Sequence, residues 1–236
     1  MAHLKRLTSP KSWNISKKEY KFATRPSPGP HSLQSSIPLN LVVKNLLGYA
    51  STTRESKKII TSGKIIVDGR ARKEHTYPLG VMDIIELPDT KSAFILLLDE
   101  LGKFKLHPIK HTKTKYCKII DKTTLRKKKT QLNLSSSRNI IIAKDTYKVG
   151  DTVLLDLSTN NIKSHLKFEK DATAYITDGK YVGSTGKILD ITKSSLSKDK
   201  ITIKIGNHKY ETLKDYAFIV DKEFEEYKKD ERNEEH

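Results

Sequence analysis

Cysteine is almost missing from this chain, because Cys117 is the single one among 236 residues. One thiol excludes an intrachain disulfide and any zinc site that needs several cysteine ligands, and it fits a reducing compartment. Tyr116 and Ile119 beside it are residues that favour strands. We therefore predict that Cys117 packs in a core and does not act as a nucleophile.

Long apolar runs are also missing. The longest, Ala93 to Leu98, has six residues, whereas a membrane-spanning helix needs about 20. The N-terminus begins with charged residues and lacks the apolar segment of a secretion signal. These absences predict a protein of the cytoplasm without a membrane partner.

Motifs of catalysis and metal binding are incomplete. Gly183–Lys187 resembles a phosphate-binding loop, but Tyr181 and Ile188 stand where that loop requires glycine and serine or threonine. His107 and His111 are four positions apart, but a proline between them disfavours a metal-binding helix and no third ligand is evident. We predict no catalytic residue, no metal, no cofactor and no small-molecule substrate.

Positive charge is what the chain has in excess. The formal net charge is +17 and the isoelectric point about 9.7. Residues 221–236 hold eight acidic and four basic side chains, so the rest of the chain carries +21. Solubility needs a net charge on the order of 2–8. The larger excess predicts a polyanionic partner, with nucleic acid ahead of an acidic membrane.

Residues 1–37 are predicted to form a basic arm. Seven cations face one acid, Glu19, and frequent prolines prevent long helices. Trp13, Tyr20 and Phe22 stand among the lysines. Aromatic rings interleaved with cations can stack on bases while the cations neutralise phosphates. The alternative is that Trp13 anchors the arm onto its own protein, and the sequence leaves both open.

Two short helices are predicted at the start of residues 38–92. Residues 38–47 carry an apolar stripe with the helical period, and Gly48 follows as a stop. Thr52-Thr53-Arg54-Glu55 is a capping box that opens a second helix, which ends before Gly63. Apolar residues at 59 and 60 supply its buried side. Its basic side chains are left for solvent or a ligand, and its N-terminus favours a phosphate.

A β-hairpin is predicted directly after these helices. Ile65–Val67 reads as a strand, and Asp68-Gly69 is the two-residue sequence expected of a type I′ turn. Arg70 and Arg72 lie on the return strand, and Ile84–Leu87 reads as another strand. Cations on both the helix and the hairpin make this a small αβ module suited to phosphate.

Residues 93–171 are predicted to form a central all-β domain of short strands. The expected strands are Phe94–Leu98, Phe104–Leu106, Lys118–Ile120, Gln131–Leu134, Asn139–Ala143 and Thr152–Leu157. Arg126-Lys127-Lys128-Lys129 is a predicted basic loop. Four adjacent cations repel one another unless they are solvated or paired with phosphate, and a purely solvated loop is the alternative.

Residues 172–220 are predicted to form a third folded unit. Five strands are expected, and their number and spacing suit a small SH3-like barrel. They are Ala174–Thr177, Lys187–Ile191, Ile201–Ile205, Tyr210–Leu213 and Phe218–Val220. Residues 221–236 form an acidic tail with few apolar side chains, for which we expect fraying or disorder.

Residues 38–87 resemble the small RNA-binding domain shared by ribosomal protein four, some pseudouridine synthases and some tyrosyl-tRNA synthetases. The signature is the helix pair, then Ser62–Gly69, then Gly80 and Asp83 before a strand. The resemblance implies that the second helix and the following loop face RNA. The residues it implies are Arg54, Lys57, Lys58, Lys64, Arg70 and Arg72.

Two further resemblances extend along the chain. Residues 172–191 resemble the KOW motif of ribosomal proteins and transcription-elongation factors, with Gly179, Gly183 and Gly186 at its glycine positions. Over residues 3–220 the chain is similar to the archaeal and eukaryotic type of small-subunit ribosomal protein four, more closely to archaeal members. That similarity is carried by His3–Arg6, Trp13, Arg25–His31, Ile37–Leu39, Tyr77–Gly80, Lys122–Thr124 and Glu211–Tyr216.

Together these patterns predict a β-rich α+β protein and a structural constituent of the small ribosomal subunit. Its partners would be small-subunit ribosomal RNA and neighbouring ribosomal proteins. The candidate RNA-binding residues outside the small domain are Lys5, Arg6, Lys11, Trp13, Arg25, Arg126, Lys127, Lys128, Lys129 and Lys180. A free regulatory, transcription or translation factor is the alternative. An RNA-modifying enzyme is less favoured, because no Arg-Leu-Asp catalytic segment occurs.

Overall fold

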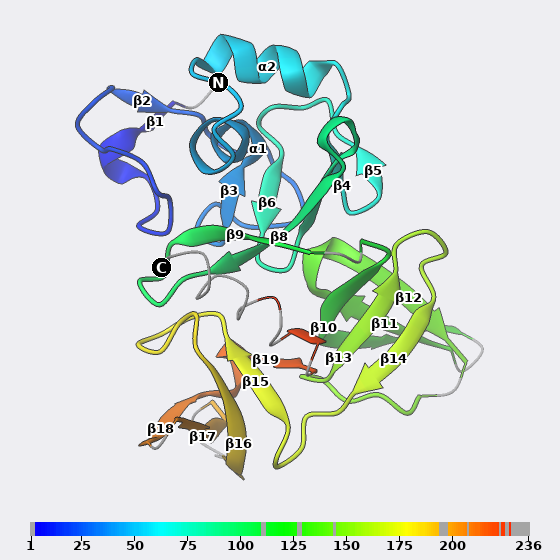
Figure 1. Cartoon of the computed structure of the whole chain (residues 1–236). Helices are drawn as coiled ribbons and strands as arrows, with labels where there is room; N and C mark the ends of the chain where they lie inside the picture. The colour runs from blue at the N-terminus through cyan, green and yellow to red at the C-terminus, as the bar shows by residue number, and fades with distance from the viewer. Residues whose placement is uncertain are drawn as a thin grey trace. The chain divides into compact units, whose positions relative to one another are not determined.

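A computed structural model describes residues 3–109, 112–126, 129–143, 145–193, 198–206, 208–221, 223, 224 and 227. The chain divides into two compact units, Met1–Lys113 and Thr114–His236. Strands dominate the described residues and helices are few (Figure 1), which confirms the prediction of a β-rich protein. No helix within these ranges is long and apolar enough to span a membrane.

The arm of the first unit contains regular structure. Strand β1 (Leu4–Lys5) pairs antiparallel with β2 (Phe22–Ala23), and a 3-10 helix over Arg6–Thr8 follows β1. A second pair joins β3 (Ser36–Pro38) to β6 (Pro78–Gly80). Through this pair the end of the arm is part of the fold of the small αβ module.

The two predicted helices are both present. Helix α1 (Leu39–Leu41) continues into a π-helical turn over Val42–Leu46, and Gly48 follows with a φ of 68°. Helix α2 (Thr53–Thr61) begins at the predicted capping box. An apolar stripe explains the first helix, because Leu39, Val42 and Val43 are all fully buried.

A five-stranded antiparallel sheet forms the β half of the first unit, in the order β5-β4-β7-β8-β9. Its strands are β4 (Ile66–Val67), β5 (Arg70–Ala71), β7 (Ile84–Leu87), β8 (Ser92–Leu98) and β9 (Phe104–Pro108). Asp68 and Gly69 between β4 and β5 have φ angles of 51° and 76°. Two positive φ angles are the signature of a type I′ turn, which confirms the predicted hairpin.

The structure corrects the sheet to which β8 and β9 belong. The sequence grouped these two strands with the central β domain, whereas β8 pairs with β7 in a register that sets Ile84 opposite Ile95. The reason is packing: Ile95–Leu98 are buried in the first unit. A hairpin partner adjacent in sequence adds to a sheet with little loop-closure cost.

The second unit begins with a five-stranded sheet in the order β12-β11-β10-β13-β14. Its strands are β10 (Thr114–Thr124), β11 (Thr130–Leu134), β12 (Arg138–Ile142), β13 (Thr152–Asp156) and β14 (Ile162–Leu166). Strand β14 was not predicted. Cys117 is fully buried in a core with Ile119 and Leu132, which confirms its packing role.

A further five-stranded sheet completes the second unit, in the order β18-β17-β16-β15-β19. The strands are β15 (Thr173–Ile176), β16 (Thr185–Thr192), β17 (Lys200–Ile205), β18 (His208–Leu213) and β19 (Ala217–Val220). All five predicted strands are present, around a core that includes Ile188 and Ile201. The predicted fraying of the tail is wrong at Phe224, which is fully buried with its ring 5.7 Å from that of Tyr116.

Candidate nucleic-acid interface

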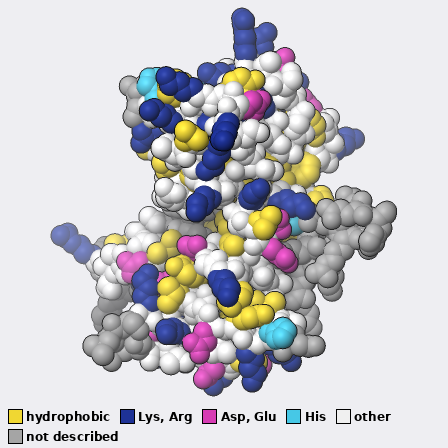
Figure 2. Space-filling view, turned by 90° about the vertical axis from the view of Figure 1, so that its left-hand side faces the viewer, with side chains coloured by type: hydrophobic (Ala, Val, Ile, Leu, Met, Phe, Trp, Pro, Cys, Tyr) yellow, Lys and Arg dark blue, Asp and Glu magenta, His cyan; other side chains and the backbone are white. Residues whose placement is uncertain are grey.

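Helix α2 presents three cations on one face. Arg54, Lys57 and Lys58 are three and four positions apart, so their side chains lie on the same side of the helix, and all three are exposed. None of them forms an ion pair with an acid in the described part of the chain. We call these three residues the α2 face. Lys and Arg side chains project at the upper edge of Figure 2, the end that α2 occupies in Figure 1.

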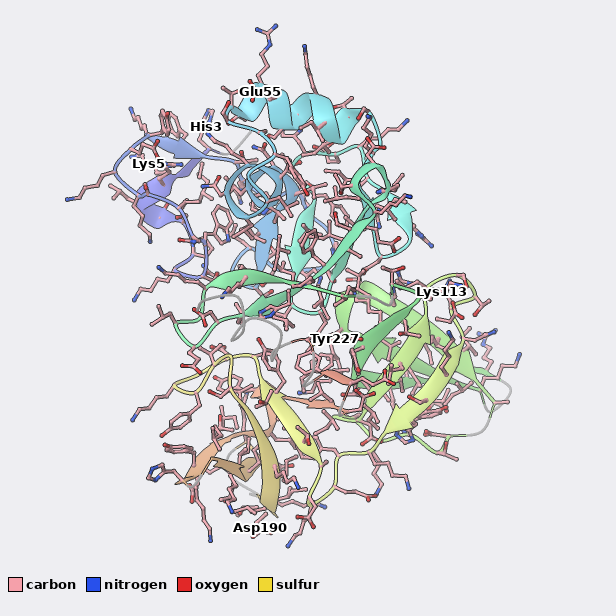
Figure 3. All side chains as sticks on the ribbon, in the orientation of Figure 1. His3, Lys5, Glu55, Lys113, Asp190 and Tyr227 are labelled. Atoms are coloured by element: carbon pink, nitrogen blue, oxygen red, sulfur yellow. The ribbon has the colours of Figure 1, made fainter. Side chains whose placement is uncertain are left out.

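The N-terminus of α2 is fixed by a reciprocal pair of hydrogen bonds. The Thr52 hydroxyl accepts from the Glu55 N–H at 3.2 Å, and the Glu55 carboxylate accepts from the Thr52 N–H at 3.2 Å. Figure 3 shows Glu55 at the start of the helix. A hydrogen bond from the Ser51 side chain, and then those from the backbone, lower the pKa of Glu55. The carboxylate therefore stays charged at the positive end of the helix dipole.

The opposite side of α2 is buried. Ile60 is fully buried, and the Ser56 hydroxyl donates to the side-chain oxygen of Asn40 in α1. The amide of Asn40 in turn donates to Thr24 Oγ1 at 2.8 Å. The exposed cations thus stand on a helix whose orientation is set by core packing and by hydrogen bonds to α1 and the arm.

The hairpin adds cations in more varied surroundings. Arg70 is exposed, and Lys64 is exposed and pairs with Asp89 at 2.7 Å. The Arg72 guanidinium lies 4.3 Å from the ring centroid of Tyr77 and is half-buried. Arg70 is therefore accessible to a ligand, Lys64 is accessible but already neutralised by Asp89, and Arg72 is largely engaged by the fold.

Two predicted residues of the arm are buried. The Trp13 side chain is 2% exposed, and its indole N–H donates to the Ser36 carbonyl at 2.6 Å. Arg6 is 6% exposed and donates to the Ser16 carbonyl at 2.5 Å and to Glu19 at 3.3 Å. These contacts favour the anchoring alternative for Trp13 and give Arg6 a bracing role. The other predicted residues of the arm, Lys5, Lys11 and Arg25, are exposed.

The arm is also held to the sheet of the first unit. His31 Nε2 lies 3.0 Å from the buried carboxylate of Asp83, which also accepts from the Gly80 N–H at 2.8 Å. A Cβ at position 80 would collide with the His31 ring. Gly80 is therefore needed for close approach, and this explains the glycine and aspartate of the signature as parts of an anchor.

The predicted cations of the second unit are exposed where they are described. Arg126 and Lys129 flank the basic loop, and the Leu125 N–H donates to the Lys129 carbonyl at 2.8 Å. Lys127 and Lys128 lie outside the described residues. Lys180 is exposed, with its ammonium 5.6 Å from the ring centroid of Tyr181.

Other lysines of the second unit are neutralised within the protein. Asp190, labelled in Figure 3, pairs with Lys170 at 2.7 Å. The further pairs are Lys198–Asp215 at 2.9 Å, Lys163–Asp156 at 3.2 Å and Lys214–Asp199 at 3.6 Å. Each pair reduces the local field that a phosphate would experience.

Sequence reasoning did not single out Lys44. Its ammonium lies 5.8 Å from the ring centroid of Tyr20, so it belongs beside the basic arm. Lys44 is the only charged residue among positions 38–47. A lone cation in an otherwise apolar helical segment is the signal that could have identified it.

Known proteins with similar sequences cover nearly all of this chain. The relatives include small ribosomal subunit protein eS4 of Methanococcus aeolicus, 47% identical over 92% of this chain and 93% of the relative. The eS4 protein of Methanocaldococcus jannaschii is 43% identical over the same shares. The chain belongs to the eS4 family. Three family models match in succession: the RS4NT (NUC023) domain over residues 2–34, the S4 domain over 38–85 and Ribosomal family S4e over 90–162.

A solved structure has the same fold. The crystal structure of the 30S ribosomal protein S4e from Thermoplasma acidophilum matches with a TM-score of 0.69 and 24% identity. The match covers 79% of this chain and 95% of that one. The S4 match spans α1, α2 and the hairpin, so the α2 face lies within the S4 domain of an eS4 family member.

Proposed function

We propose that this chain is a structural protein of the small ribosomal subunit in the cytoplasm, that it binds ribosomal RNA, and that it is not an enzyme. The observation that carries the proposal is the 47% identity over 92% of the chain to a protein named small ribosomal subunit protein eS4. Ribosomal RNA and adjacent small-subunit proteins are the proposed partners. The unpaired cations of the α2 face supply the physical reason for RNA binding.

Charge neutralisation is the proposed mechanism. Arg54, Lys57 and Lys58 would replace counterions around the phosphates of folded RNA, and release of these ions drives association. Core packing and the helix cap fix α2 in the absence of RNA, so little conformational entropy of this helix is lost on binding. Arg70 on the hairpin would add a further exposed cation, and Lys64 would have to leave Asp89 to contact a phosphate.

The remaining exposed candidates would contact RNA more peripherally. These are Lys5, Lys11, Arg25, Arg126, Lys129 and Lys180, and the proposal includes Lys127 and Lys128 of the same basic loop. Arg6, Trp13 and Arg72 would act by positioning the arm and the hairpin, because each is engaged by neighbouring groups.

The domain division is also a proposal. We infer an arm over 1–37, an S4 module that begins at 38 and is extended by β8 and β9, a central β domain that begins at β10 and ends at 171, a KOW-containing SH3-like barrel over 172–220 and a tail over 221–236. The glycine pattern supports the KOW assignment, because Gly179 and Gly183 have φ angles of 89° and 78°. A Cβ at Gly186 would contact backbone and core side chains of β17.

Binding of the full chain to fragments of small-subunit and large-subunit ribosomal RNA of equal length tests the proposal. At about 0.15 M salt we expect preferential binding to a small-subunit fragment. Replacing Arg54, Lys57 and Lys58 with Glu should weaken that binding at least about tenfold, since each lost contact also removes counterion release. Equal affinity of the protein for both RNAs, or of parent and variant for the small-subunit RNA, would contradict it.

A further inference from the structure

A pocket lies in the arm, and none of the residues that line it belongs to the α2 face. It has a volume of about 470 Å³ and is lined by four lysines together with Leu7, Tyr20 and Glu19. The lysines are Lys5, Lys17, Lys18 and Lys21. Pockets that hold small ligands typically measure about 300–1,000 Å³, so this one can accept a group the size of a nucleotide.

The large apolar side chains that line this pocket are exposed to solvent. Leu7 is 69% exposed and Tyr20 is 58% exposed, although both are large apolar residues in a folded segment. Phe22 is two positions from Tyr20 and outside the lining, and it is 48% exposed with the Lys21 ammonium 5.5 Å from its ring centroid. Accessible apolar groups gathered together mark sites of interaction. Here they are surrounded by ammonium groups, which favours a ligand that combines a flat apolar surface with negative charge.

Arg6 braces the wall of the pocket. Its guanidinium carbon lies 5.0 Å from the Tyr20 ring centroid, and it donates to the Ser16 carbonyl at 2.5 Å. It also pairs with Glu19, the one acid in the lining, at 3.3 Å. Arg6 therefore fixes the segment that carries Tyr20 and offsets the charge that would repel an anion. It is a positioning residue.

We propose that this pocket binds an unpaired nucleotide of RNA, with the base against Leu7 and Tyr20 and the phosphates among the lysines. Bases inside a duplex are stacked on both faces, so only an unpaired nucleotide can offer a base face to these side chains. An acidic protein segment would satisfy the lysines, but it would leave Leu7 and Tyr20 without a planar partner. This inference rests on the proposed function as an RNA-binding protein.

Two RNA probes of equal length separate the pocket from the α2 face. One is an unstructured oligoadenylate and the other a fully paired duplex, each titrated with the full-length protein. The variant Leu7→Ser with Tyr20→Ala should lose roughly tenfold in affinity for the oligoadenylate, as expected for loss of base stacking. Its affinity for the duplex should stay within about twofold, since no cation is removed. Circular dichroism should be unchanged, because both side chains are exposed.

Matched variants control for general surface effects. Tyr20→Phe keeps the ring and should bind oligoadenylate like the parent. Leu101→Ser removes a leucine that is 77% exposed elsewhere in the first unit and should change nothing. Photocrosslinking with an oligonucleotide that contains 4-thiouridine should label the peptide carrying Leu7 or Tyr20.

The outcomes distinguish this inference from the proposed function. If the double variant binds oligoadenylate like the parent while the Glu triple variant of the α2 face loses RNA, the pocket assignment is overturned and the function stands. If both variants keep full affinity for every RNA, both proposals are overturned. Binding of a polyglutamate peptide that depends on Leu7 and Tyr20, without such dependence for oligoadenylate, would assign the pocket to a protein partner and overturn the nucleotide proposal.

Discussion

The α2 face and the paired lysines Lys170 and Lys198 beside the C-terminal sheet β15–β19 are basic in different ways. On α2, Arg54, Lys57 and Lys58 are exposed and, among the described residues, form no ion pair with an acid. In the second unit, Lys170 and Lys198 are also exposed but lie 2.7 and 2.9 Å from Asp190 and Asp215. Judged by formal charge alone, these two sets of residues would be equally suited to bind phosphate. Their pairing indicates that Arg54, Lys57 and Lys58 are available to phosphate, whereas Lys170 and Lys198 are already neutralised by their aspartates.

Burial adds a second contrast. Partial burial, and then the charge of Lys57, lower the pKa of His75, so the field of the α2 face acts on a neighbouring titratable group. In the second unit, the Lys118 ammonium instead donates to the carbonyls of Asp215 and Ala217 at 2.8 and 2.7 Å. Lys57 is exposed and lowers the pKa of a neighbouring histidine, whereas the Lys118 ammonium is held by backbone carbonyls. The lesson is that accessibility and pairing decide which basic residues can bind RNA.

Removing core volume gives the largest expected effect. Ile60→Ala under the α2 face and Ile188→Ala in the C-terminal sheet each truncate a fully buried side chain. Each should lower the free energy of unfolding by about 2–5 kcal/mol. Among molecules still folded, only Ile60→Ala should weaken RNA binding, because it loosens the helix that carries the three cations. Chemical denaturation measures the loss of stability and RNA titration measures the loss of affinity. Equal loss of RNA affinity in both variants would contradict a special role of α2 in RNA binding.

The enclosed lysine should give the next largest effect, as a function of pH. Burial lowers the pKa of Lys118 from its ordinary value of 10.5 to about 8. Between these values the unfolded chain binds more protons than the folded one, so the Lys118 contribution to stability rises with pH across this window. The rise amounts to about 3 kcal/mol at most.

A methionine at position 118 isolates this effect. The stability of the parent relative to Lys118→Met should increase from pH 7.5 to pH 10.5, as followed by denaturant unfolding at each pH. If the difference in free energy of unfolding stays constant or falls over this window, burial does not destabilise the charged form of Lys118.

Loss of the helix cap should have a moderate effect confined to the first unit. Thr52→Ala removes the acceptor for the Glu55 N–H and should cost about 1 kcal/mol. Thr52→Ser keeps the acceptor and serves as the control. Amide hydrogen exchange of α2 should accelerate in the alanine variant only. Unchanged exchange would mean that core packing alone fixes the helix.

Neutralising paired lysines should give the smallest effect. Lys170→Ala and Lys198→Ala each remove a cation that already has an aspartate partner. Filter binding should show little change in RNA affinity, whereas Lys57→Ala with Lys58→Ala should weaken it several-fold. A larger loss from the C-terminal pair would reverse the proposed assignment of surfaces.

Local signals in the sequence were sufficient for some parts of this structure. The capping box at Thr52 and the turn at Asp68-Gly69 were predicted correctly, because each motif encodes its own hydrogen bonds or φ angles. The β-rich class and the five strands of the C-terminal sheet followed from short apolar segments separated by turn residues.

Contacts between distant segments were not predictable in the same way. Arg6 and Trp13 are interior residues because they meet groups 10 and 23 positions away, and no local pattern encodes those contacts. Strand β14 was missed because its polar sequence becomes a strand only by pairing with β13. For the interface, the sequence supplied the cations of α2, but only the structure separated accessible cations from paired ones.

The salt dependence of RNA binding tests the central claim most directly. The logarithm of the binding constant for a small-subunit RNA fragment is measured against the logarithm of salt concentration for three proteins. They are the parent, the Glu triple variant of the α2 face, and a variant with Lys163, Lys170 and Lys198 changed to Glu. Each lost phosphate contact reduces the slope by about 0.7–0.9, so the α2 variant should have a slope smaller by about 2–3 and the other variant a nearly unchanged one. Equal slopes for the two variants would contradict the account.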